Sequence, residues 1–268
     1  ASDGYKRQVL HSAHDPGMAR RLALMLSENG IEVREADGPV TVEGRRLPQM
    51  GTFIVPMDQP TRRFVRNLLD AHVPMDEAFV QRQIDRRARR ESDEIYDLTA
   101  WSQSLLWDVE VLVSEETTGA AGALITKDST PTETTLPEAS VGYLMPWGTS
   151  TASAVVEALR TGIRVRAAGA EFTLGGRKYN VGTAIVRTAE NSASLRQELG
   201  RIASVHGAEV IPIDDSYVEE GASLGSNSVR ALRSPRVLLV YDSPGQTNSV
   251  GFARYVLDQR YAHPTVAV

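Results

Sequence analysis

The chain has 268 residues, 41% hydrophobic and 24% charged, which suits roughly two globular domains that each bury a core. A formal net charge of −5 excludes the basic surface typical of nucleic-acid binding, and no run of about 18 apolar residues is present to span a membrane. The absence of cysteine excludes disulfides, thiolate metal sites and a cysteine nucleophile, and it is compatible with an oxidising or a reducing compartment.

The first part of the chain predicts a β-α-β unit. Residues 8–13 predict a short strand, and Asp15-Pro16 predicts a helix start, because aspartate caps free backbone amides and proline suits the first helical position. Asn29-Gly30 predicts a left-handed helix end, and residues 31–35 predict the next strand. Such a crossover is nearly always right-handed and joins parallel strands. The elements expected next are a hairpin over residues 39–47, a strand over 52–55 and a helix over 61–69.

The same order returns later in the chain, which indicates an internal repeat. Gly30-Ile31-Glu32-Val33 matches Gly162-Ile163-Arg164-Val165, and Gly51-Thr52-Phe53-Ile54-Val55 matches Gly182-Thr183-Ala184-Ile185-Val186. The offset is 132 at the first glycine and 131 at the last, which predicts a one-residue insertion in the middle loop of one copy. The expected elements of the second copy are strands over residues 141–146, 163–167, 184–186 and 208–213, a hairpin over 172–179, and helices over 150–160 and 194–205.

Three segments lie outside the repeat. Residues 75–95 alternate arginine with acidic residues and predict a solvated helix with ion pairs four residues apart; the alternative is nucleic-acid binding. Residues 114–139 are rich in Thr, Gly, Ser and Pro and predict a linker. Residues 235–268 predict a fresh β-α-β start. Because an open parallel sheet should not end there, we expect the chain to be a fragment that stops inside a domain.

The predicted fold class is α/β, with two repeated β-α-β-plus-hairpin units followed by a truncated flavodoxin-like β-α-β start. The expected domains are residues 1–113 for the first α/β repeat with a helical insertion, 114–139 for a linker, 140–234 for the second repeat and 235–268 for the start of a further domain.

A candidate ligand site follows from the expected strand ends. His14, Asp15, Trp147 and Thr149 lie where parallel strands are expected to end, and in open α/β sheets ligands bind outside the carboxyl ends of the strands. The alternative role of these residues is helix capping and turn formation. His11 and His14 are three residues apart at a strand end and should point to opposite faces, which is poor chelating geometry.

Two short motifs match catalytic patterns. His206 and Glu209 match the HxxE pair of zinc carboxypeptidases, in which an imidazole and a carboxylate bind one zinc. The alternative is a helix C-cap with a histidine at the negative end of the helix dipole. Gly221-Ala222-Ser223-Leu224-Gly225 matches the GxSxG nucleophile elbow, but the strand expected before it ends near Ile213, so the alternative is a glycine-rich loop.

A longer string carries a family resemblance. Residues 94–102, which read Glu-Ile-Tyr-Asp-Leu-Thr-Ala-Trp-Ser, together with residues 51–56 and Gln59-Pro60, resemble the C-terminal region of large bacterial proteins of the zinc carboxypeptidase family. Those proteins have a secretion signal, an N-terminal carboxypeptidase A-like catalytic domain and a long C-terminal region that ends in a class I glutamine amidotransferase-like domain. Residues 223–226, 236–240 and 251–261 resemble the start of that last domain.

The resemblance implies an accessory, non-catalytic region of a secreted or periplasmic zinc metallocarboxypeptidase. No segment matches the catalytic domain, so the chain is assigned no catalytic residue, no metal ligand and no cofactor, and zinc is expected in the catalytic domain outside it. The expected partners are that catalytic domain and a peptide substrate; a homo-oligomer is left open. Two other functions remain open: a stand-alone small-molecule binding protein with a cleft between its repeats, and a serine hydrolase that uses Ser223.

Overall fold

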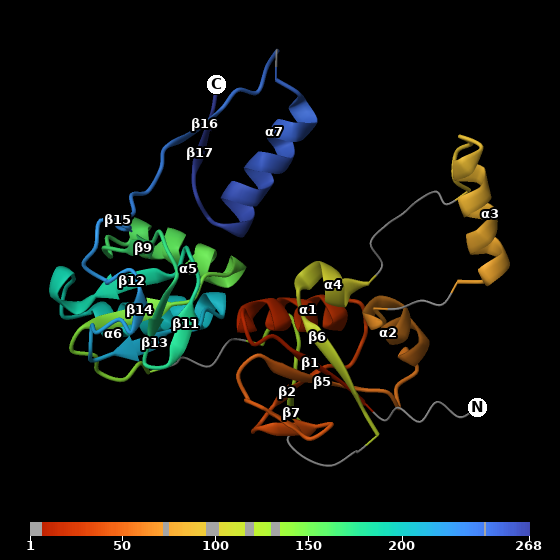
Figure 1. The fold of residues 1–268 in the computed structure, drawn as a ribbon, viewed down its shortest axis with the longest axis horizontal. Coiled ribbons are helices and arrows are strands. Elements are labelled where there is room, and N and C mark those ends of the chain that lie inside the picture. Colours follow the sequence, from red (N-terminus) through yellow and green to blue (C-terminus); the bar gives the residue numbers. More distant parts are fainter. Residues whose placement is uncertain (1–6, 72–74, 95–101, 116–120, 130–134, 244) are drawn as a thin grey trace. The chain divides into compact units, whose positions relative to one another are not determined.

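The structure, a computed structural model, describes residues 7–71, 75–94, 102–115, 121–129, 135–243 and 245–268. The chain divides into two units, one of residues 1–12 and 18–127 and the other of residues 13–17 and 128–268. Both units combine helices with antiparallel sheets (Figure 1), so the predicted α/β class is confirmed. The string that carries the family resemblance lies mostly outside the described residues, since residues 95–101 are not among them.

The first unit is built on a five-stranded sheet in the order β6-β1-β5-β2-β7. Its strands are β1 (Arg7–His11), β2 (Arg34–Ala36), β5 (Thr52–Pro56), β6 (Glu110–Ser114) and β7 (Ala121–Leu124), with a hairpin of β3 (Val40–Val42) and β4 (Arg45–Leu47). The helices are α1 (Pro16–Glu28), α2 (Arg62–Leu69), α3 (Glu77–Ala88) and α4 (Gln103–Trp107). The predicted start of α1 at Pro16 is confirmed.

The second unit has a five-stranded sheet in the order β13-β8-β12-β9-β15. Its strands are β8 (Gly142–Met145), β9 (Arg166–Ala168), β12 (Ala184–Arg187), β13 (Ile211–Ile213) and β15 (Val229–Ala231). A smaller sheet joins β10 (Phe172–Leu174), β11 (Arg177–Tyr179) and β14 (Glu220–Gly221). The helices are α5 (Thr149–Arg160), a 3₁₀ turn η1 (Thr188–Glu190) and α6 (Leu195–His206).

In each main sheet a helix connects two strands, and the strand that follows the hairpin lies between these two. β5 pairs antiparallel with both β1 and β2, and β12 pairs antiparallel with both β8 and β9. The helix-connected strands therefore run parallel to each other without being neighbours, as in the split β-α-β of ferredoxin-like folds. The predicted parallel direction of these strands is confirmed, but neighbouring strands within each main sheet are antiparallel, so neither sheet is the open parallel sheet that the strand-end site assumes. β5 is apolar toward both faces, as its burial shows, and can therefore occupy the centre of the sheet.

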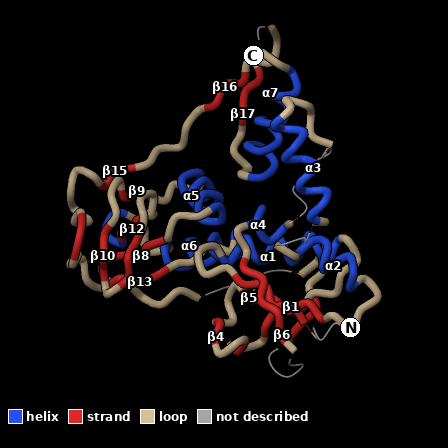
Figure 2. Tube along the Cα trace, turned by 45° about the vertical axis from the view of Figure 1, so that its right-hand side comes forward, coloured by secondary structure: helices blue, strands red, loops and turns tan. Residues whose placement is uncertain are grey.

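Each main sheet has helices on one face and the hairpin on the other (Figure 2). Successive side chains of a strand point to opposite faces. In the first unit Leu10 and Phe53 therefore join the core with α1 and α2, whereas Val9 and Ile54 pack with the hairpin. In the second unit Tyr143 and Met145 pack with α5 and α6, whereas Leu144 and Ile185 pack with the hairpin.

The two hairpins have the same turn geometry. Glu43 and Gly44 have φ values of 51° and 77°, and Gly175 and Gly176 have φ values of 60° and 72°. Positive φ at both central residues is the type I′ turn, whose twist matches that of the flanking strands. The predicted hairpins are confirmed, with Val42 opposite Arg45 in the first unit and the corresponding pairing in the second.

A carboxamide side chain bridges two loops at the same place in each unit. Gln59 Oε1 accepts from the Glu32 amide at 2.8 Å, and Gln59 Nε2 donates to the carbonyls of Glu32 and Pro56 at 3.2 and 2.6 Å. Asn191 Oδ1 accepts from the Arg164 amide at 2.7 Å, and its Nδ2 donates to the carbonyls of Arg164 and Arg187 at 3.2 and 2.9 Å. The units thus share connectivity, turns and this bridge; the internal repeat itself stays a prediction.

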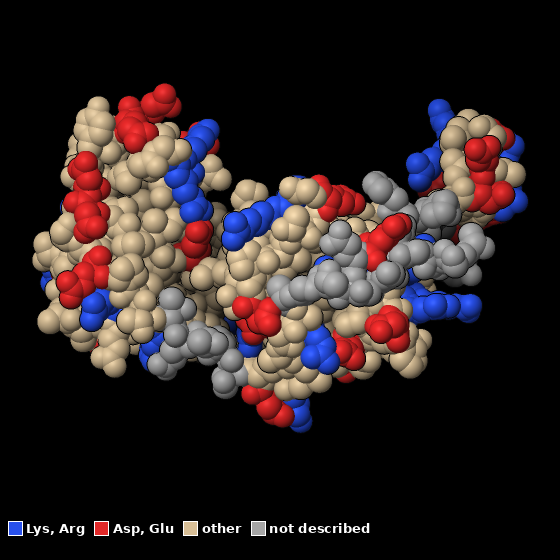
Figure 3. All heavy atoms as spheres, turned by 90° about the horizontal axis from the view of Figure 1, so that it is seen from below, with Lys and Arg blue, Asp and Glu red and all other residues tan. Residues whose placement is uncertain are grey.

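Several segments differ from the expected organisation. Residues 121–124, inside the predicted linker, form β7 and pair with β2, and residues 229–231 form β15 at the corresponding edge of the other sheet. Each of these two strands only adds a short edge to an existing sheet. Neither has a sequence pattern that predicts its pairing. In residues 75–94 the arginines of α3 bind acidic residues beyond the helix end, as for Arg87 and Asp93 at 2.7 Å, so the predicted spacing of four residues within the helix is wrong. Figure 3 shows both signs of charge interspersed on the face drawn.

The C-terminal residues form a small β-α-β piece, as predicted. β16 (Val237–Leu239) pairs in parallel with β17 (Thr265–Ala267), and α7 (Thr247–Arg254) runs into a π-helical turn, η2 (Tyr255–Arg260), between them. Parallel strands are normally covered on both faces. Here Leu238 and Val266, which are directly opposite each other, are 64% and 57% exposed.

We expect Asn191→Ala to lower the free energy of unfolding by about 1–2 kcal/mol, because three hydrogen bonds to backbone groups are lost. Hydrogen exchange at the Arg164 amide should accelerate in parallel. Asn191→Asp keeps the oxygen that accepts from this amide but replaces the donor to the two carbonyls with an acceptor, so its amide protection should fall between those of wild type and Asn191→Ala. Equal protection in Asn191→Ala and wild type would contradict the bridging role.

Candidate functional site

The residues of the predicted ligand site are arranged around the N-terminus of α5. The segment of residues 13–17 belongs to the second unit, and Asp15 Oδ2 accepts a hydrogen bond from the Ser150 amide at 2.9 Å. A carboxylate at this position satisfies a free amide of the first helical turn and opposes the positive end of the helix dipole. Thr149 is the first residue of α5. The geometry of Asp15 is that of a helix cap, which is the alternative role that the sequence allows.

Trp147 and His14 are exposed beside this cap. Trp147 is 55% exposed, and its indole lies over Gly182, where an added Cβ would come within 3.0 Å of Trp147 Cγ. His14 is exposed, whereas His11 is buried and its Nδ1 is 3.0 Å from Thr52 Oγ1. The two histidines therefore do not act together. Ligands bind at strand ends in open parallel sheets, whereas both main sheets are antiparallel, so the position of these residues does not by itself indicate a ligand site.

The HxxE residues make two separate contacts, a hydrogen bond for His206 and an ion pair for Glu209. His206 Nε2 is 2.6 Å from Glu157 Oε2 on α5, and Glu157 also binds Arg201 at 2.7 Å. Glu209 instead forms a bidentate pair with Arg177, at 2.9 and 2.8 Å. Gly207 has φ 70° and ends α6 in the left-handed conformation, as the C-cap interpretation predicts.

The carboxylate between α5 and α6 has a perturbed pKa. Burial alone would raise the pKa of Glu157, but the hydrogen bonds from Arg201 and His206 outweigh it and hold the pKa below its ordinary value. Glu157 is thus ionised at neutral pH and links the two helices that cover the second sheet.

Ser223 lies on a loop between β14 and β15. Its carbonyl accepts from the Ser226 amide at 3.0 Å in a turn, and the next regular element is the strand β15. A nucleophile elbow needs a helix directly after the serine, because the strained strand-to-helix turn exposes the hydroxyl. Ser223 lines a cavity of about 420 Å³ together with Arg187 and the buried Leu224.

Two further cavities lie one in each unit, beside the edge formed by β2 and β7 in the first unit and by β9 and β15 in the second. The cavity of the first unit has a volume of about 700 Å³ and is lined by Glu32, Arg34 and Gln59 among others. The cavity of the second unit has a volume of about 540 Å³ and is lined by Arg164 and Arg166 among others. Positions 32 and 34 correspond to positions 164 and 166 in the matched sequences. Neither cavity includes His14, Asp15, Trp147 or Thr149 in its lining.

Neither cavity was predicted from the sequence, although the matched strings differ in charge at one position that lines them. The matched strings carry Glu32 in one copy and Arg164 in the other, a reversal of charge at one structural position. Arg233 also lines the cavity of the second unit. It follows the short edge strand β15, whose pairing was not predicted.

Within the described part of the chain, no three His, Asp or Glu side chains are grouped to hold a metal ion, and no helix combines the length and apolar character needed to cross a bilayer. Comparison of the chain with protein-family models, curated proteins and solved structures finds no match.

We expect Asp15→Ala to reduce stability by about 1 kcal/mol through loss of the α5 cap, measured by thermal unfolding. Asp15→Asn keeps a side-chain oxygen acceptor and should cost only a few tenths as much. His14→Ala, at an exposed neighbour, should leave the transition unchanged. Wild-type stability of Asp15→Ala would show that the carboxylate is not a cap.

We expect Glu157→Gln to destabilise the protein at pH 7 by about 1 kcal/mol. Because the folded pKa of Glu157 is lowered, its contribution is present above the ordinary value of 4.5 and is lost as the pH falls through the folded pKa. Urea unfolding of both proteins from pH 7 to pH 3 should therefore show curves that converge below about pH 4.5.

Glu138→Gln is the control for this titration, because Glu138 pairs with Arg196 at 3.3 Å while its side chain is 90% exposed. An exposed pair of this kind contributes little, so this variant should follow wild type throughout. A Glu157→Gln difference that persisted unchanged to pH 3 would contradict the ion-pair origin of the effect.

Proposed function

We propose that this chain is a non-catalytic accessory region of a secreted or periplasmic zinc carboxypeptidase-like protein, used for domain packing, substrate recognition or assembly. The family part of this proposal rests on the sequence resemblance. One structural observation carries the non-catalytic part: the residues that match catalytic motifs have structural contacts of their own. His206 binds Glu157, Glu209 binds Arg177, and Ser223 lies on a loop between two strands.

The C-terminal piece supports a role in packing against another domain. Leu238, Val240, Val266 and Val268 are each more than half exposed. Leu238 and Val266 are paired across the parallel strands, so the apolar side chains extend over both strands. An exposed apolar surface of this kind is typical of a protein contact. The proposed partner is the carboxypeptidase A-like catalytic domain of the same polypeptide, where we expect the zinc.

A stand-alone small-molecule binding protein remains the second candidate, with the cavities within the units as its binding sites in place of the expected cleft between the repeats. Each unit has an open cavity of a size that suits a small molecule. A solute that binds the folded chain alone would raise its unfolding temperature in proportion to the logarithm of its concentration. The serine hydrolase alternative predicts labelling of Ser223 by a fluorophosphonate.

The purified chain should bind no stoichiometric zinc after dialysis against zinc and should release no C-terminal residues from peptides, because its HxxE residues do not converge. Metal analysis and a peptidase assay check this prediction. The catalytic domain, added separately, should supply the activity and should co-elute with the chain on size-exclusion chromatography. Bound zinc with peptidase activity that His206→Ala abolishes would overturn the proposal.

A further inference from the structure

We propose that the cavity at the β9–β15 edge of the second unit binds a small oxyanion, a carboxylate or phosphate group, through Arg164 and Arg233. Both residues line this cavity of about 540 Å³, together with the paired side chains of Arg166 and Glu190. The inference is independent of the accessory role, since it concerns a site within one unit.

The strand register places the two arginines side by side. Ala231 is opposite Arg166, and the Leu232 amide donates to the Val165 carbonyl at 2.9 Å. Continuing this antiparallel register puts Arg233 opposite Arg164. Directly opposite residues on antiparallel strands have Cβ atoms about 4.5–5.5 Å apart, and alternation along the strand puts Arg164, Arg166 and Arg233 on one face.

The acidic residue of the cavity is already engaged. Glu190 accepts three hydrogen bonds from Arg166, at 2.9–3.1 Å, and a further one from Arg187 at 3.2 Å. Within the described residues, the guanidinium groups of Arg164 and Arg233 have no ion-pair partner. Like charges directly opposite each other destabilise a sheet. A bound anion would convert this repulsion into two charge-assisted contacts.

The first unit provides an internal comparison. There the residue equivalent to Arg164 is Glu32, which binds Arg34 at 2.8 Å. The corresponding pair in the second unit, Arg164 and Arg166, has the same charge on both members, and Arg166 turns to Glu190 instead. One unit therefore neutralises this position with its own carboxylate, whereas the other presents an arginine that an external oxyanion would satisfy.

The backbone around the arginines is fixed before a ligand arrives. The Asn191 bridge holds both the amide and the carbonyl of Arg164. The end of α5 also borders the cavity, at Leu159 and Gly162, but its last carbonyls are satisfied by the amides of residues 161–163. The negative end of the helix is thus largely capped and opposes an anion only weakly.

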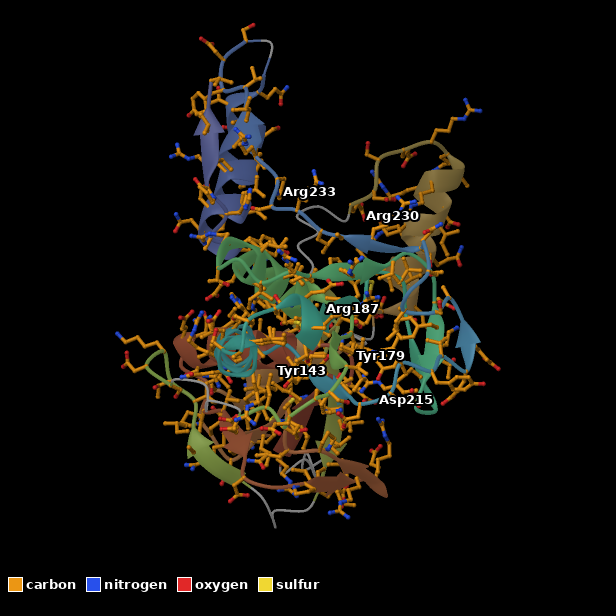
Figure 4. All side chains as sticks on the ribbon, turned by 90° about the vertical axis from the view of Figure 1, so that its left-hand side faces the viewer. Tyr143, Tyr179, Arg187, Asp215, Arg230 and Arg233 are labelled. Atoms are coloured by element: carbon orange, nitrogen blue, oxygen red, sulfur yellow. The ribbon has the colours of Figure 1, made fainter. Side chains whose placement is uncertain are left out.

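Arginine suits this role because its planar guanidinium binds carboxylate and phosphate through two parallel hydrogen bonds. Two such groups, one just before β9 and one just after β15, define a site for a single small ligand. An extended basic surface for a polyanion is a different arrangement, and Arg230 shows the contrast. It is also exposed and belongs to β15, but it is opposite Ala167 and is not among the residues that line the cavity. Figure 4 labels Arg230 on β15 and Arg233 on the segment that follows it.

The test is titration of the whole chain with inorganic phosphate and with succinate at constant ionic strength, followed by calorimetry and thermal unfolding. Wild type should bind one equivalent, and the ligand with the lower Kd identifies phosphate or carboxylate as the preferred group. Arg164→Gln and Arg233→Gln should each weaken binding about tenfold, because each removes a charge-assisted pair. Arg230→Gln is the matched control on the same strand and should bind within about twofold of wild type.

Arg164→Glu separates binding from folding. It restores the residue type of the first unit, where Glu32 binds Arg34, the equivalent of Arg166. The new carboxylate should neutralise the arginines of the cavity, raise the unfolding temperature without ligand and abolish the response to both anions. The proposal is overturned if wild type binds neither anion, if Arg164→Glu retains binding, or if Arg230→Gln loses as much affinity as Arg233→Gln.

Discussion

The position of β5 and β12 between the strands that a helix connects is the constraint on which each unit depends. Each of these strands forms antiparallel ladders on both sides and is buried toward both faces. Alternation of side chains then assigns one set to the helices and the other to the hairpin. The hairpin is needed because it covers the second apolar face. Its type I′ turn pairs its two strands, and a short loop then leads into the central strand.

The same framework carries different chemistry in the two units. The carboxamide bridge at Gln59 or Asn191 holds the start of β2 or β9 in the same way in both. The side chain presented at the bridged position is Glu32 in one unit and Arg164 in the other. The bridge contacts only the backbone of Glu32 or Arg164. The side chain at this position can therefore change its charge without losing the bridging hydrogen bonds. Binding properties can therefore diverge while the fold is kept.

The chemically active side chains show why short motifs are weak guides to function. His206 and Glu209 are separated by the end of α6, and the chain reverses there at Gly207 with φ 70°. Their side chains consequently meet Glu157 and Arg177, which belong to α5 and β11. Motif spacing carries chemical meaning only when the intervening backbone is the helix or strand that the motif assumes, and here it is neither.

The sequence by itself determined the local features: the start of α1 at Pro16, the turn at Gly44, the end of α6 at Gly207 and the matched order of elements in the two units. Capping and turn preferences depend on a few neighbouring residues, so they are readable from the chain. Only the tertiary structure decided which strands pair, that β7 and β15 complete the sheets, that Asp15 caps α5, and that Arg233 lines the same cavity as Arg164. These outcomes depend on contacts between residues distant in sequence, which hydrophobic periodicity does not encode.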